Sequence, residues 1–403
     1  HRDLHSFPTR RPSDLRIIMI ISIGLISFNS VAIEEKTLKK FSGYDEKSDL
    51  VIKYDDVDLI LDSAVLFVGK SSRAKASKKS AKTGTRLKNK SKPYTALEGN
   101  RFYYKGFDSP EKVLLLTNIR KSLEQLPAST PLKYFTKDEQ LAYWLNLYNI
   151  SVLEQLVDLY PKRSLKSDIE GDLMTEKFLN ISGEKLSLDD IKQIVIYNFG
   201  YDPLLIYGFH QGNIAGPDIR GFAYTGKDVW QTLEKNADWF INSNRGTFSH
   251  SQSRFRVSYL YEQYEDFFKA PNGDLKSHLE KFLLRSHKEK MLAAKEITID
   301  IEDWGFADVH GGGRNFGGSI ASNSAALIDA FVPLSSGVNE VSMTNAGVRN
   351  GQAAGMSPMA RFSAENQSHL MEILKVREVR SGSVTVKDLD ENQSDEDTPN
   401  KGN

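Results

Sequence analysis

The chain has 403 residues, of which 39% are hydrophobic and 26% charged, with 53 basic and 53 acidic side chains. This size allows one large or two ordinary domains with a substantial core, and the composition is not that of a disordered or collagen-like chain. The formal net charge of zero argues against a protein that binds nucleic acid over its whole surface. Because the chain has no cysteine, disulfides, thiolate metal sites, cysteine nucleophiles and a lipoprotein anchor are excluded.

The first 32 residues contain two segments that we expect to lie outside the mature fold. His1–Leu15 lacks an initiator Met and resembles translated sequencing-adapter read-through, an assembly artefact that carries no functional information. Arg16–Ala32 reads as a signal peptide, because the apolar run Ile17–Phe28 is followed by small residues ending at Ala32. As a helix this run reaches only about 18 Å, too short to cross a bilayer. The alternative is a buried N-terminal helix.

The signal peptide predicts cleavage after Ala32 and a periplasmic or secreted protein that is soluble and does not span the membrane. Residues 33–106 are then an N-terminal extension, in which Leu50–Val68 predicts two short extended runs around an acidic turn. Residues 70–92 hold ten Lys and Arg and no acid, which predicts a disordered, solvated loop. The alternative is an arm that makes weak contacts with a polyanion, although no aromatic residue interrupts the run to stack on bases.

Residues 107–301 read as one globular domain, and the chain as a whole predicts an α+β, predominantly α-helical fold with a small β-hairpin or short sheet. The helix that opens with a capping box at Thr136 is apolar round much of its circumference, so we expect it to be central and buried. Helices are predicted at 110–126, 137–157, Leu188–Tyr197, Lys227–Asn242, Tyr259–Phe268 and Leu275–Leu284, a hairpin at 178–188 and a strand at Arg254–Ser258.

The sequence changes character after residue 301. Residues 302–363 are rich in Gly, Ser and Asn, and residues 364–387 predict a short helix or strand segment, with a helix at Ser368–Val379. Residues 388–403 contain six acids and almost no apolar side chain, which predicts a disordered acidic tail.

Several segments resemble a bacterial family known as "domain of unknown function 547". The resemblance rests on EQLAYWLNLYN at Glu139–Asn149, on the hairpin and helix of Ile181–Ile191, on Asp202–Thr225 and on the aromatic segment Ser258–Phe268. Together these cover Phe107 to Phe268. The resemblance implies a bacterial protein of a type that is often exported, and it implies no settled activity.

The chain departs from the family at the positions that would carry a nucleophilic mechanism. Many members have His three residues after the Asp-Pro pair and Cys in the following loop, whereas this chain has Ile206, Gln211 and Gly216 there. Because a Cys–His mechanism needs a thiolate and an imidazole within hydrogen-bond reach, this chain cannot assemble one. If the relatives are enzymes of that type, the resemblance implies that this branch is inactive or has become a binder.

The loop His210–Pro217 is the best candidate for a ligand site. Its glycines permit close backbone approach, and His210, Gln211 and Asn213 offer neutral donors and acceptors suited to a sugar or a peptide. The alternative for His210 is a packed histidine with no role in binding. Tyr224, from the segment that resembles the family's loop region, is included in the predicted ligand site.

Asn146 and Asn149 share one face of the central helix, and each must satisfy its amide inside an apolar environment. They either hold the backbone of a neighbouring loop or line a polar pocket. Arg220 and Arg245 either hold a ligand carboxylate or pair with acids of neighbouring helices. We include Asn146, Asn149 and Arg220 in the predicted site. The helix that ends at Asn242–Gly246 is expected to end with a left-handed residue.

Two further patterns carry little chemistry. His310–Gly313 resembles the oxyanion-hole string of lipases, but the companion G-x-S-x-G motif is absent from the sequence. The histidines show no i, i+4 pairing, and Asp388–Asn392 lacks the Gly and distal Glu of a calcium loop. We therefore predict no metal and no cofactor.

These patterns together predict an exported, non-catalytic domain of the bacterial cell envelope that binds an unknown small molecule or envelope protein. The alternative is a hydrolase of unknown substrate that uses an unrecognised site near His210.

Overall fold

The structure is a computed structural model, and it describes residues 33–75, 94–249, 253–269, 271, 273–309 and 356–371. The predicted artefact and signal segments, most of the basic loop, the His310–Gly313 string and the acidic tail lie outside the described residues.

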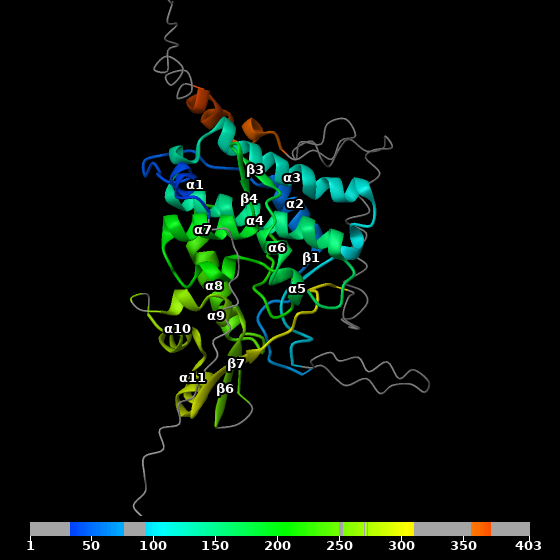
Figure 1. Cartoon of the computed structure of the whole chain (residues 1–403), viewed down its shortest axis with the longest axis vertical. Coiled ribbons are helices and arrows are strands. Elements are labelled where there is room, and N and C mark those ends of the chain that lie inside the picture. The colour runs from blue at the N-terminus through cyan, green and yellow to red at the C-terminus, as the bar shows by residue number, and fades with distance from the viewer. Residues whose placement is uncertain are drawn as a thin grey trace, which may run out of the picture. The chain divides into compact units, whose positions relative to one another are not determined.

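Helices form most of the regular structure in the described ranges, and three small sheets accompany them (Figure 1). The predicted α+β, predominantly helical fold is confirmed. The helices are α1 (Glu35–Lys40), α2 (Asp55–Ala64), α3 (Pro110–Ser129), α4 (Lys137–Leu159), α5 (Lys166–Ile169), α6 (Asp172–Thr175), α7 (Leu188–Phe199), α8 (Val229–Ile241), α9 (Leu260–Gln263), α10 (Leu275–Phe282) and α11 (Arg285–Ala293). Short 3-10 turns lie at η1 (Tyr104–Gly106), η2 (Leu132–Tyr134), η3 (Leu205–Gly208), η4 (Glu265–Phe268) and η6 (Pro358–Arg361).

In the described residues the strands pair into two antiparallel two-stranded ladders, of which β3–β4 is a hairpin, and one three-stranded sheet. In the larger sheet, β6 is the central strand, antiparallel to β5 and parallel to β7, with a bulge after Val257. The strands are β1 (Val65–Leu66), β2 (Arg101–Phe102), β3 (Leu179–Ile181), β4 (Glu184–Leu186), β5 (Thr247–Ser249), β6 (Arg254–Ser258) and β7 (Glu296–Ile301).

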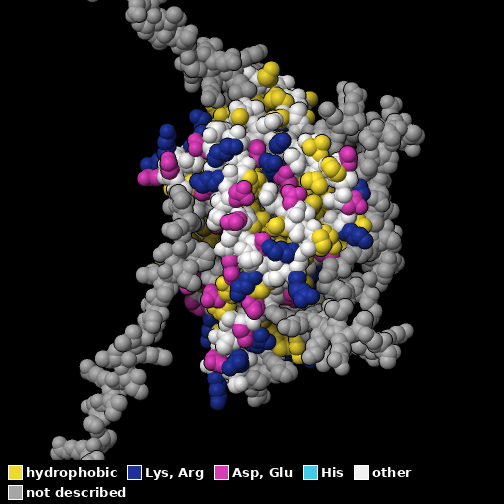
Figure 2. Space-filling model, turned by 45° about the vertical axis from the view of Figure 1, so that its right-hand side comes forward, with side chains coloured by type: hydrophobic (Ala, Val, Ile, Leu, Met, Phe, Trp, Pro, Cys, Tyr) yellow, Lys and Arg dark blue, Asp and Glu magenta, His cyan; other side chains and the backbone are white. Residues whose placement is uncertain are grey.

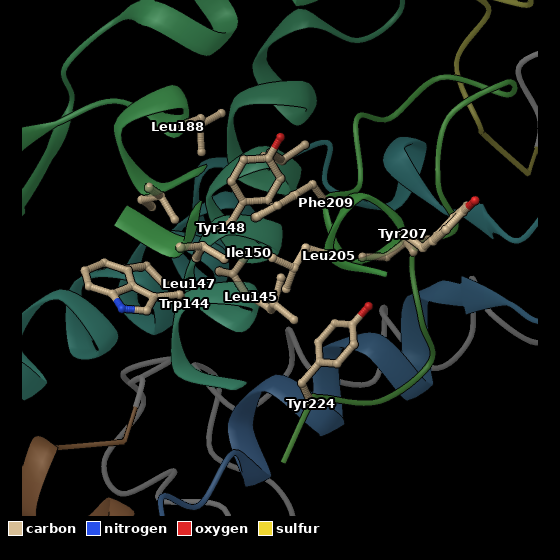
Figure 3. Close-up of a cluster of buried hydrophobic side chains, with 14 of the residues drawn as sticks. Trp144, Leu145, Leu147, Tyr148, Ile150, Leu188, Leu205, Tyr207, Phe209 and Tyr224 are labelled. Atoms are coloured by element: carbon tan, nitrogen blue, oxygen red, sulfur yellow. The ribbon is translucent and has the colours of Figure 1, made fainter. Parts of the chain in front are cut away.

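Helix α4 lies at the centre of the core, as its sequence predicts. Almost every residue from Glu139 to Val157 is buried, and α3, α7 and α8 all contact the helix. Figure 3 shows side chains of α4, including Trp144 and Tyr148, packed with those of η3 and the loop after it, including Leu205 and Phe209. The polar side chains on α4 therefore lie in an apolar interior, where each one needs a partner.

Local sequence signals set several boundaries correctly. Ser187 and Asp190 form a complete capping box at the start of α7. The hairpin before it turns at Ser182 and Gly183, which both have positive φ, as a two-residue turn requires. At α4 only half of the predicted capping box forms. The Thr136 hydroxyl accepts from the Glu139 N–H at 3.2 Å, but the Glu139 carboxylate binds the backbone N–H of Ile52 instead.

The prediction of two extended runs in Leu50–Val68 is wrong over most of its length. Residues 55–64 form helix α2, and only Val65–Leu66 is a strand. Val57, Ile60 and Ala64 are buried on one face of α2, at helical spacing, while the acidic residues that read as a turn form its first turn. Short apolar runs fit both periods, so the sequence alone does not separate helix from strand here.

Two other local predictions need correction. Helix α8 ends near Asn242, but neither Asn244 nor Gly246 has positive φ, so the expected left-handed cap is absent. Gly246 is instead required by close packing, because a Cβ there would lie 2.0 Å from the carbonyl oxygen of Phe240. The helix predicted at Tyr259–Phe268 is broken into α9 and η4.

Segments from both ends of the described chain join the same hydrophobic core as α4. The predicted extension contributes Phe41 and Ile52, and the C-terminal residues 356–371 contribute Phe362 and Leu370. Residues 364–371 are helical, so the helix begins before the predicted Ser368, and residues beyond 371 lie outside the described part of the chain.

Candidate functional site

The two central asparagines hold loop backbones. Asn146 donates to the carbonyl of Tyr224 and accepts from the Tyr224 N–H, both at 2.8 Å. Asn149 makes the equivalent pair, donating to the carbonyl of Gly208 and accepting from the His210 N–H, both at 3.0 Å. Of the two roles that the sequence leaves open, the structure therefore places both amides in the first, because each satisfies two backbone groups in a buried loop.

His210 is packed into the protein and is 1% exposed. Its Nδ1 lies 2.8 Å from the carbonyl oxygen of Pro217, which can only accept, so Nδ1 carries the proton. Its Nε2 is buried and has no partner in the described residues. Burial lowers the pKa of His210 to about 4, so the ring is neutral near pH 7.

The rest of the loop is fastened to residues 303–307. The N–H groups of Ile214 and Ala307 bind the carbonyls of Gly305 and Gly212, at 2.9 and 2.7 Å. Gln211 and Asn213 are also buried, and they line a cavity of about 10 Å³. That volume suits roughly one water molecule, so the loop presents no space for a sugar or a peptide in this conformation.

Arg220 and Arg245, for which the sequence left the same two roles open, have different surroundings. Arg245 is 3% exposed, pairs with the carboxylate of Asp218 and donates to the carbonyl of Gly216 at 2.8 Å. Arg220 is 8% exposed, and its Nη1 binds the amide oxygen of Asn236. Within the described residues Arg220 has no carboxylate in salt-bridge contact.

Arg220 lies in an open cleft of about 570 Å³, which we call the Arg220 cleft. Its walls are the loop residues Arg220 and Phe222, Asp228 and one face of α8 from Gln231 to Asp238, and Lys281 and Phe282 at the end of α10. The lining residues of α8 recur at helical spacing, and α8 packs against α10, which forms the opposite wall. The cleft is therefore built on two packed helices.

Aromatic and charged groups are combined in this cleft. The Arg220 guanidinium lies 4.2 Å from the ring centroid of Phe222, and that ring is 45% exposed. Three basic and three acidic side chains line the cleft, so their formal charges cancel. Burial is the main cause of a lowered pKa for Arg220, while the nearby Tyr224, Asp218 and Asp228 act in the opposite direction.

The predicted site thus divides into two groups of residues. One group is buried: Asn146 binds the backbone of Tyr224, Asn149 binds the backbone of Gly208 and His210, and Gln211 and Asn213 line the small cavity. The Tyr224 hydroxyl accepts from Asn236, the residue that also binds Arg220. Only Arg220 among the predicted residues lines the cleft. The sequence predicted the helix Lys227–Asn242, but it did not point to Phe222 or to the α8 residues as parts of a site, because the cleft depends on a contact between α8 and α10.

Other kinds of site have little support in the described ranges. No cluster of three or more His, Asp or Glu side chains there could hold a metal ion. None of the helices in those ranges combines the length and the apolar character that crossing a membrane requires. Figure 2 shows basic and acidic side chains intermingled on the drawn face, with no continuous patch of one sign among the coloured residues.

The described residues therefore define a mainly helical α+β domain with a polar network beneath an amphipathic surface cleft. Residues 132–241, about a quarter of the chain, match the family described as "Protein of unknown function, DUF547". This confirms the resemblance for that stretch, which includes α4, the loop His210–Pro217 and the α8 wall of the cleft. No curated protein and no solved structure matches the chain.

Proposed function

We propose that this protein is a non-catalytic ligand-binding domain of the bacterial cell envelope, and that it binds its ligand in the Arg220 cleft. One observation carries the proposal: a cleft of about 570 Å³ combines an 8% exposed arginine with two aromatic side chains, Phe222 and Phe282. Small-molecule sites are typically concave, and they combine aromatic contacts with polar groups that fix the orientation of the ligand. A small molecule is therefore the favoured partner over an envelope protein.

The binding proposal is tested by a thermal-shift screen of residues 33–403 against envelope glycans, peptides, amino acids, nucleotides and divalent ions. A ligand at a hundred times its Kd adds about 2.7 kcal/mol to the free energy of unfolding, which raises the Tm by a few degrees. We expect the Gln231→Trp variant to lose this shift, because Gln231 is an exposed residue whose enlarged side chain would fill the cleft.

Gln125→Trp is the matched control, since Gln125 is an exposed residue of α3 outside the cleft. It should keep the full shift. A shift that survives Gln231→Trp but disappears in a Gln211→Ala/Asn213→Ala double variant would move the site to the loop. No shift with any class of compound would contradict a small-molecule role.

A hydrolase near His210 is the second candidate, motivated by the Nε2 of that residue, which has no hydrogen-bond partner among the described residues. A neutral imidazole with a free Nε2 can act as a general base if a nucleophile reaches it. Turnover of peptide, ester or glycan substrates that His210→Ala abolishes while folding is retained would establish this candidate and overturn the non-catalytic proposal.

Export is supported by the apolar run Ile17–Phe28 and the small residues that precede Ile33. Expression of the chain from Arg16 onward, behind a supplied initiator Met and basic residues, should give a periplasmic or secreted product that begins at Ile33. N-terminal sequencing of that product checks this. A product that keeps Arg16–Ala32 and stays in the cytoplasm would contradict export.

A further inference from the structure

The Arg220 guanidinium has more donors than partners. Arginine presents five N–H donors, and the described residues supply one hydrogen-bond acceptor, Oδ1 of Asn236. Nε is buried without a partner, and one face of the group stacks on Phe222. A largely buried charge without a counterion is unfavourable unless further hydrogen bonds satisfy it. The group is therefore incomplete within the described part of the chain.

The acids near Arg220 have other partners. Asp218, the acid closest in sequence, pairs with Arg245. Glu234 pairs with Lys281 at 3.5 Å, and Asp238 pairs with Lys70 at 3.0 Å. Asp228 accepts a hydrogen bond from the hydroxyl of Thr225 at 2.6 Å. A ligand that supplies an anion would thus meet a guanidinium that no carboxylate of the described residues contacts.

We propose that the ligand of the Arg220 cleft carries a single carboxylate, which Arg220 binds, joined to an aromatic or apolar group that lies against Phe222 and Phe282. This inference rests on the proposed function. Guanidinium groups bind planar carboxylates through two parallel hydrogen bonds. The formal charges that line the cleft cancel, so they add no net attraction for a second negative charge, and the single guanidinium of Arg220 matches one carboxylate.

The test compares two probes that differ only in the anion, N-acetyl-L-phenylalanine and N-acetyl-L-phenylalaninamide, by calorimetric titration of residues 33–403. The carboxylate should bind at least tenfold more tightly than the amide. Arg220→Gln should abolish this preference, and Arg220→Lys should keep only part of it, since lysine cannot make the bidentate contact. Arg163→Gln, a change at an exposed arginine, should leave both affinities unchanged.

Three results would overturn the carboxylate proposal. If the two probes bind equally tightly, the cleft is still a binding site, but the carboxylate contributes nothing to the affinity. Tighter binding of phenyl phosphate than of the carboxylate would replace the monoanion with a phosphate. If neither phenylalanine probe binds while another class of compound gives a shift that Gln231→Trp removes, the proposed function stands and this inference fails. Because the probe comparison uses the unmodified protein, it is decisive even if Arg220→Gln does not fold.

Discussion

Replacing Arg361 with Met should lower the free energy of unfolding by about 3–5 kcal/mol, because it leaves the buried carboxylate of Asp56 without its counterion. The side chain of Arg361 is 0% exposed and that of Asp56 is 5% exposed. Two guanidinium nitrogens bind the two carboxylate oxygens, at 2.7 and 3.1 Å, and Arg361 also binds Ser122 and the carbonyl of Lys53. Urea unfolding of the wild type and Arg361→Met measures the loss.

Arg285→Met is the matched control, because the Arg285 side chain is 94% exposed and pairs with Glu289 at the surface. It should cost less than about 1 kcal/mol. A double variant, Arg361→Met with Asp56→Leu, should regain much of the stability, since no unpaired buried charge remains. A loss below about 1 kcal/mol in Arg361→Met alone would show that residues 356–371 contribute little to the folded domain.

Stability that Glu139 contributes should fall as the pH rises from about 4.5 to 7. Glu139 is 4% exposed, and burial raises its pKa to about 7, with the nearby Asp138 adding to the rise and hydrogen bonds from Ile52 and Gly226 opposing it. The folded state therefore holds a proton that the unfolded state has released. The stabilisation from this proton is complete below the pKa of Glu139 in the unfolded chain, and it is lost as the pH rises through the pKa of Glu139 in the folded protein. The free energy of unfolding falls by about 3 kcal/mol between these two values.

The measurement is the free energy of unfolding from pH 4.5 to 8 for the wild type and Glu139→Gln. Burial lowers the pKa values of His210, His278 and His287 to about 4, so these groups give the opposite slope in part of this range. Because they are common to both proteins, the difference isolates Glu139. The wild type should lose about 3 kcal/mol relative to the variant over this range. Parallel profiles would contradict the raised pKa of Glu139.

Local patterns predicted the elements whose signals are local. The spacing of apolar residues after Thr136 indicated a buried central helix, and the turn residues at 182–183 indicated the hairpin before α7. The prediction of extended runs in Leu50–Val68 was wrong because the short apolar runs there fit both a strand and a helix. Only packing against the core decides between the two.

The candidate site depended on contacts between distant parts of the chain. Asn146 and Asn149 could be predicted to need partners, but the partners are backbone groups 59 to 78 residues away. Arg220 and Arg245 looked alike in the sequence, and only the fold assigns Asp218 to Arg245. The cleft itself arises where α8 packs against α10, a tertiary contact that has no local signature.

Hydrogen–deuterium exchange, with and without saturating N-acetyl-L-phenylalanine, tests the location of the ligand site most directly. We expect increased protection in residues 220–238 and around Phe282, with no change in the loop His210–Pro217. In that loop the amides of His210, Ile214 and Ala215 are already held by Asn149 and by residues 303 and 305. Protection confined to residues 210–217 would contradict the assignment of the site to the Arg220 cleft.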